Sequence, residues 1–120
     1  MLVAVSSQGD NLDALVDPRF GRASTFLVVD TLTMAFEVIE NTQNLDLSQG
    51  AGIQAAQNIA GHNPAAVLTG NCGPKAFRVL KAAGIDVLIG VKGAIRDAVQ
   101  SYMEGKHEPT KDANVEGHWM

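Results

Sequence analysis

The sequence predicts a single α/β domain with a mixed β-sheet. Short apolar, β-branched runs alternate along the second half of the chain with segments whose apolar residues recur at helical spacing. Before that alternation come two strand-like segments whose charged residues alternate, as on a hairpin with one solvated face. A chain of 120 residues can bury a core without a disulfide or a structural metal.

Three strands are expected in the first half. Residues 2–6 form an apolar run that stops before Gln8-Gly9, which predicts a buried strand. Residues 25–30 and 35–41 flank residues 31–34, and the alternating glutamates of the second segment indicate a hairpin with one wet face. We expect this hairpin at the edge of the sheet.

Residues 7–24 are expected to form a long loop. Asp, Asn, Pro and Gly occur there too densely for a regular element, and loops of this length are usually functional or disordered. Arg19, Phe20 and Arg22 favour function, whereas the three aspartates of the loop are expected to form turns. Such a loop could close over a bound ligand.

Helices are expected at three places in the second half. Apolar residues at helical spacing run from residue 53 until Gly61, after a second loop that contains Ser48. Residues 74–83 begin with a proline and end before a glycine, as helices often do. Residues 95–102 carry apolar side chains at i, i+3, i+4 and i+7.

The apolar runs at residues 65–68 and 85–91 predict two further buried strands. Because helices connect them, these strands should pair in parallel through right-handed crossovers, while the hairpin adds antiparallel strands on the other side. We therefore predict one domain over residues 1–105. Residues 106–120 are polar and aperiodic and are predicted to be a flexible tail.

Composition excludes several classes of protein. One cysteine cannot form an internal disulfide, and the first residues lack the pattern of a signal peptide, so a cytoplasmic location is expected. No apolar run approaches the ~18 residues of a membrane span. A net charge of -4 argues against nucleic acid or an anionic membrane as partner.

Familiar sites are also missing from the sequence. There is no phosphate-binding Gly-Lys-Ser or Gly-Lys-Thr, and Gly50-Ala51-Gly52 lacks the third glycine of a dinucleotide fingerprint. The three histidines, His62, His107 and His118, do not have the spacing of a zinc site. Nucleotide hydrolysis and mononuclear zinc chemistry are therefore not expected.

The predicted topology brings the functional loops to one edge of the sheet. That edge collects the loop at 7–24, the turn at 48–52, the turn around residue 72 and the segment 91–93, with the N-termini of all three predicted helices. Each N-terminus carries about half a positive charge and unpaired N–H groups. Four of the nine Lys and Arg residues lie in or beside these loops: Arg19, Arg22, Lys75 and Lys92. An anion site is expected there.

Cys72 lies between an apolar run and Pro74, where a strand should end and a helix begin. A thiol at a helix N-terminus should ionise more readily than a free cysteine, so Cys72 is a candidate metal ligand or reactive group. The alternative is a small apolar residue that fills the turn. An iron-sulfur cluster held in the usual way needs about four cysteines, so any cluster here must arrive with its sulfides in place.

Three stretches carry a resemblance to a known family: Val3-Ala4-Val5-Ser6, Asp17-Pro18-Arg19-Phe20-Gly21-Arg22-Ala23, and Thr69-Gly70-Asn71-Cys72-Gly73-Pro74-Lys75-Ala76-Phe77 with Leu80 to Ile85 behind it. With these the chain resembles the dinitrogenase iron-molybdenum cofactor biosynthesis family, over nearly its whole length. The resemblance implies a ribonuclease H-like fold with sheet order 3-2-1-4-5. It also implies binding of a preformed metal-sulfur cofactor.

Carried over position by position, the resemblance points to Arg19, Gly21 and Arg22 in the first loop and to Asn71, Cys72, Gly73 and Lys75 in the second. Gly50 and Lys92 join them on the topological argument. The cofactor implied is a molybdenum-containing metal-sulfide cluster of the Mo-Cu-S or Fe-Mo-S type. Proteins that deliver or receive it are the implied partners.

Three functions remain open at this point. The first is non-catalytic binding, carriage or storage of an anionic metal-sulfide cluster. The second is a metal-free protein-interaction or regulatory module that uses the same edge. The third, a cysteine-dependent enzyme, lacks a histidine or acid placed to activate Cys72. We favour the first and expect no enzymatic activity.

Overall fold

The computed structural model describes residues 1–41 and 50–111. Within these residues the chain forms five strands and three helices, in the order β1 (Leu2–Ser7), β2 (Thr25–Asp30), β3 (Phe36–Glu40), α1 (Ala51–Ala60), β4 (Ala66–Leu68), α2 (Pro74–Ala82), β5 (Asp86–Leu88) and α3 (Ile95–Met103). The predicted element order is confirmed. Ser48 lies outside the described residues.

The strands form one mixed sheet in the order β3-β2-β1-β4-β5. β1 pairs in parallel with β4, and β4 with β5, through the short apolar runs that the sequence predicts to be buried. β1 pairs antiparallel with β2, and β2 with β3, in a hairpin with Val28 opposite Glu37. The sheet order 3-2-1-4-5 and the edge position of the hairpin are therefore confirmed.

Two element boundaries differ from the prediction by more than one residue. β5 ends at Leu88 rather than at residue 91, because Gly90 turns the chain with a φ of 73° and its N–H donates to Gly70 O. Residues 89–91 thus leave the strand and join the loops at its end. α1 begins at Ala51, after the N-cap Gly50, whose φ of 80° suits glycine.

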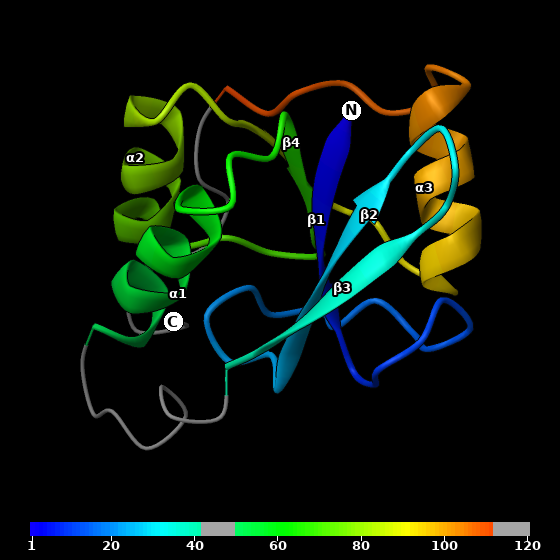
Figure 1. Ribbon diagram of the computed structural model, residues 1–120. Coiled ribbons are helices and arrows are strands. Elements are labelled where there is room, and N and C mark those ends of the chain that lie inside the picture. The colour runs from blue at the N-terminus through cyan, green and yellow to red at the C-terminus, as the bar shows by residue number, and fades with distance from the viewer. Residues whose placement is uncertain (42–49, 112–120) are drawn as a thin grey trace.

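The helices cover both faces of the sheet (Figure 1): α1 and α2 pack side by side on one face and α3 on the other. This arrangement follows from the period of each strand, since successive side chains point to opposite faces. In β1, Ala4 enters the core beneath α1 and α2, whereas Val3 and Val5 enter the core beneath α3. Two apolar cores result, one on each side of the sheet.

Residues after α3 run along the outer edge of the sheet. The N–H of Thr110 donates to Val87 O at 2.7 Å, and its hydroxyl accepts from the N–H of Ile89 at 3.4 Å. A domain that ends at residue 105 and a flexible tail over 106–120 stay predictions, and residues 112–120 lie outside the described chain. Over the described residues, the structure has no helix long and apolar enough to cross a membrane.

Candidate functional site

The loops that follow β1, β4 and β5 meet at one edge of the sheet, which we call the rim: residues 8–24, 69–73 and 89–94. These three strands are parallel, so their carboxyl ends share this edge. α1 and α2 both run away from the rim toward the opposite edge, as the crossovers between parallel strands require (Figure 1). The predicted convergence is thus present for these three loops, while the predicted turn at 48–52 lies partly outside the described residues.

The first two loops are joined by their backbones. Arg19 and Asn71 form an isolated parallel β-bridge, and the N–H of Phe20 donates to Asn71 O at 3.1 Å. The side-chain amide of Asn71 donates in turn to Pro18 O at 3.0 Å. The Arg19 loop is therefore held against the turn that leads into α2, which brings together residues more than fifty positions apart in the sequence.

Buried polar groups support this junction from below. The Ser6 hydroxyl donates to Asp17 O at 2.7 Å, and the Thr69 hydroxyl lies 2.8 Å from the Ser6 hydroxyl, at the ends of β1 and β4. The Asp17 carboxylate accepts from the N–H of Arg19 at 2.9 Å. The expected turn-forming role of this aspartate is confirmed.

The third loop, residues 89–94, is hydrogen-bonded to both other loops of the rim. The N–H of Gly90 donates to Gly70 O at 2.9 Å, and the N–H of Val91 donates to Thr69 O at 3.1 Å. The N–H of Val16 donates to Gly93 O at 2.8 Å. Lys92 is exposed on this loop and thus lies on the rim.

Residues 7–24 do not form a free lid. Phe20 is 1 % exposed, and its ring lies 5.0 Å from the ring of Phe26 in the sheet. Further along, Asn41 donates to Ala23 O at 2.7 Å and to Gly21 O at 3.4 Å. Closure over a ligand would break these contacts, so the structure argues against the lid that we expected. Gly21 itself is buried beneath the loop rather than exposed on it.

The N-termini of α1 and α2 lack the side chains that usually cap a helix or compensate its dipole. Both N-cap residues are glycines, Gly50 and Gly73, so neither supplies a side-chain cap, and neither helix has an acidic residue in its first turn. The two helices pack against each other and point their N-termini toward the same edge. Each N-terminus contributes about half a positive charge, so the pair favours an anion.

The N-terminus of α3 does not join them. The N–H of Ile95 donates to Ala14 O at 2.9 Å and the N–H of Arg96 donates to Leu12 O at 2.8 Å, so the loop of residues 8–24 already satisfies two of its first donors. α3 also carries an acidic residue, Asp97, in its first turn. The prediction that all three helix N-termini serve one anion site is therefore wrong for α3.

Cationic side chains lie on the rim and in the first turn of α2. Arg19 lies on the first loop and Lys75 in the first turn of α2, both exposed, and Arg22 is partly exposed near the end of the same first loop. Within the described residues, Arg19, Lys75 and Lys92 form no ion pair.

Cys72 does not behave as its position in the sequence predicts. Its side chain is 1 % exposed and packs in the core with Phe20, Ala76 and Leu80, while its Sγ lies 3.7 Å from Gly73 O. Burial raises the pKa of the Cys72 thiol to about 12. The expected easier ionisation is wrong, because the thiol is buried in the apolar core, where desolvation disfavours the thiolate. The packing alternative agrees with this placement.

The donors at the rim do not fit a bare metal ion. Over the described residues, no group of three or more His, Cys, Asp or Glu side chains could hold one. His62 lies 4.0 Å from Glu37, away from the rim, and His118 is outside the described residues. N–H groups and cations instead fit an anion whose metals already have their own ligands.

A model of the dinitrogenase iron-molybdenum cofactor family matches residues 1–105. The chain belongs to this family. Among curated sequences it is 34% identical over 96 residues to an uncharacterized protein of Methanocaldococcus jannaschii, a match that covers 78% of this chain and 80% of that protein.

Solved structures of related proteins have the same fold. The apo form of the orange protein from Desulfovibrio gigas is 46% identical, with a TM-score of 0.92 over 95% of this chain and 96% of that one. A putative NifB protein from Thermotoga is 33% identical, with a TM-score of 0.81 over 97% and 98% of the two chains. The family resemblance stated from the sequence is confirmed.

Sequence reasoning missed two features of this family member's rim. Gly70 lies at the crossing of the two loops, and the paired hydroxyls of Ser6 and Thr69 lie under it. Their signal in the sequence is their place at the ends of predicted buried strands, within stretches that carry the family resemblance. Without a known partner loop, that signal does not separate them from ordinary turn residues.

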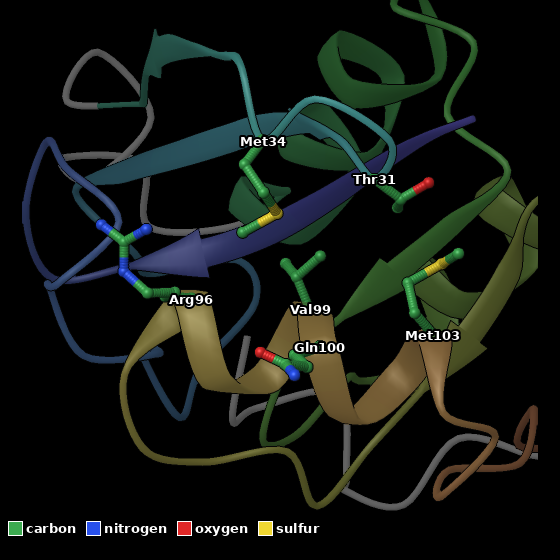
Figure 2. Close-up of a pocket in the computed structure, with 6 residues that line it drawn as sticks. All are labelled: Thr31, Met34, Arg96, Val99, Gln100 and Met103. Atoms are coloured by element: carbon green, nitrogen blue, oxygen red, sulfur yellow. The ribbon is translucent and has the colours of Figure 1, made fainter.

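Two hollows lie elsewhere on the molecule. One of about 280 Å³ opens between α3 and the turn of the β2–β3 hairpin (Figure 2), where Met34 and Val99 face each other and Met103 lies at one end. The other, of about 220 Å³, lies over the sheet near Leu2 and Phe36. Neither contains a residue predicted for the site.

Proposed function

We propose that this protein binds a preformed, anionic metal-sulfide cluster at the rim and carries or stores it without catalysing a reaction. One observation supports the proposal most directly: two glycine-capped helix N-termini point to the same edge, next to exposed cations on loops that are joined to each other. A ligand that brings its own sulfides needs charge neutralisation and N–H donors more than protein thiolates.

Each proposed site residue has a specific part. Arg19, Arg22 and Lys75 neutralise the cluster, with Lys92 at the margin of the rim. Backbone N–H groups that follow Gly50 and Gly73 donate to its sulfides. Asn71 holds the Arg19 loop in place through its bonds to Pro18 and Phe20. Cys72 packs beneath the site in the structure described here, so metal ligation by its sulfur would require it to leave the core.

The family to which the chain belongs and its similarity to the orange protein support a molybdenum-containing cargo. We propose a cluster of the Mo-Cu-S or Fe-Mo-S type, with dedicated proteins that deliver it or receive it. The cytoplasmic location stays a prediction from the sequence. The test is anaerobic purification, followed by a visible spectrum and measurement of Mo, Cu and Fe per chain. A colourless, metal-free protein that also fails to take up tetrathiomolybdate would favour the metal-free interaction module.

Reversing two charges at the rim tests the electrostatic part of this proposal. We expect Arg19→Glu with Arg22→Glu to lower the affinity for tetrathiomolybdate, a dianionic molybdenum sulfide, by at least about tenfold, because attraction becomes repulsion. Equilibrium dialysis followed by visible absorption measures it.

The matched control reverses two lysines at the opposite edge. Lys81 and Lys106 lie at the end of α2 and beyond α3, in exposed ion pairs with Asp86 and Glu104. Lys81→Glu with Lys106→Glu changes the net charge equally, and exposed pairs contribute little to stability. If both double variants lost affinity equally, total charge and not the rim would account for binding.

A further inference from the structure

Gly70 occupies a position where the backbones of two loops touch. A Cβ atom built on it would lie 2.7 Å from Pro18 Cα, 2.8 Å from Pro18 O and 3.1 Å from Pro18 C. These are backbone atoms, so no change of rotamer relieves the overlap. Only glycine allows an approach this close.

The contact with Pro18 is the centre of a set of bonds that hold the two loops in register. On one side lie the bond from the Asn71 amide to Pro18 O and the bond from the Phe20 N–H to Asn71 O. On the other side Gly70 O accepts from the N–H of Gly90. A side chain at residue 70 would therefore push the Arg19 loop away from the turn that begins α2.

The strands beneath add a second constraint. Ser6 donates its hydroxyl proton to Asp17 O, so the neighbouring hydroxyl of Thr69 donates to Ser6. All three groups are buried. These bonds hold the start of the Arg19 loop against the ends of β1 and β4. The close approach at Gly70 sets the distance between this loop and the N-terminus of α2.

We propose that Gly70 is a positioning residue, which fixes the spacing between the Arg19 loop and the N-terminus of α2 so that the site is formed before its cargo arrives. This inference rests on the proposed function for the identity of the cargo. A closing lid would protect the Phe20 N–H more strongly from exchange when cargo is bound. A site formed in advance protects it equally with and without cargo.

The experiment compares Gly70→Ala with Gly61→Ala in the full chain. Gly61 has a φ of -63° and its added Cβ would meet nothing closer than 3.4 Å, so alanine fits there. Amide exchange at Phe20 in the cargo-free protein reports the loop junction. Affinity for tetrathiomolybdate, read from visible absorption, reports the site.

For Gly70→Ala we expect Phe20 to exchange about tenfold faster, as for a lost hydrogen bond, and affinity to fall about tenfold, with far-UV circular dichroism unchanged. Gly61→Ala should change neither. Equal protection of Phe20 in Gly70→Ala and the wild type would overturn the inference. Faster exchange at Phe20 in Gly70→Ala with undiminished affinity for tetrathiomolybdate would also overturn it. So would exchange at Phe20 in the wild type that slows when cargo binds.

The two proposals fail in different ways. If wild-type protein took up no tetrathiomolybdate, the proposed function would be lost, and Phe20 exchange in Gly70→Ala would still test the junction. If Gly70→Ala did not fold, Ser6→Ala removes the bond to Asp17 O without adding volume. Ser6→Ala should raise the rate of amide exchange at Arg19 and Phe20 and lower the affinity for tetrathiomolybdate. No change in either quantity would refute the positioning role.

Discussion

Cys72 illustrates how one side-chain direction changes the chemistry of a residue. At the start of α2 a thiol that faced the helix N-terminus would be a thiolate ligand with a lowered pKa. This thiol instead faces the core between α2 and the sheet, where desolvation raises its pKa to about 12. Its role in the described structure is packing, and the proposed anion site would use N–H groups and cations in its place.

The buried thiol predicts slow alkylation. Relative to a cysteine with the ordinary pKa of 9.0, one with a pKa of about 12 has about a thousandfold less thiolate at pH 8. Iodoacetamide should label the native protein at least about a hundredfold more slowly than the urea-unfolded protein, as mass spectrometry would show.

The same shift sets the direction of a pH effect on stability. Below pH 9 the thiol is protonated in both states; as pH rises toward 12, only the unfolded state ionises, so the free energy of unfolding falls over that interval. Equal labelling rates for native and unfolded protein would contradict a buried, protonated Cys72.

At the scale of elements, the rim is built from loops that the sheet and the core hold in place. Phe20 is the clearest example, because it lies in the middle of a loop and yet is buried against Phe26. The same loop satisfies the first N–H groups of α3 and so removes that helix from the anion site. This loop therefore excludes the N-terminus of α3 from the proposed site.

Removing the Phe20 ring should free this loop and weaken the fold. We expect Phe20→Ala to lower the free energy of unfolding by about 3–5 kcal/mol, the usual cost of deleting a buried phenylalanine. Urea denaturation measures it. Leu32, 80 % exposed on the hairpin turn, is the control, and Leu32→Ala should change stability by no more than about 0.5 kcal/mol. Equal effects of the two changes would mean that Phe20 does not anchor the loop.

At the scale of the whole molecule, an acidic protein carries Arg19, Arg22 and Lys92 on its rim, together with the three aspartates of residues 8–24. The net charge of -4 opposes binding of an anion at long range, whereas the rim cations and two helix N-termini attract it at short range. Charge at the rim is exposed, so salt should screen it.

Raising the salt concentration should therefore weaken binding. The screening length falls from about 10 Å at 0.1 M to about 3 Å at 1 M, and we expect affinity for tetrathiomolybdate to fall by about tenfold over that range. The Lys81→Glu/Lys106→Glu protein should show the same salt dependence as the wild type, and the Arg19→Glu/Arg22→Glu protein a weaker one. A salt-independent affinity would point to coordination or packing in place of charge.

The sequence alone determined the elements and their order, because period, proline and glycine signals are local. Pro74 at the start of α2, the apolar run of β4 and the alternation in β3 each indicate structure over a few residues. The predicted order of elements also indicated that the candidate loops lie at one edge, since the carboxyl ends of parallel strands share an edge of the sheet. Only the tertiary structure decided which way Cys72 points, which N–H groups of α3 are already used, and that Gly70 touches Pro18. These three facts depend on contacts between segments distant in sequence, whose geometry no local pattern contains.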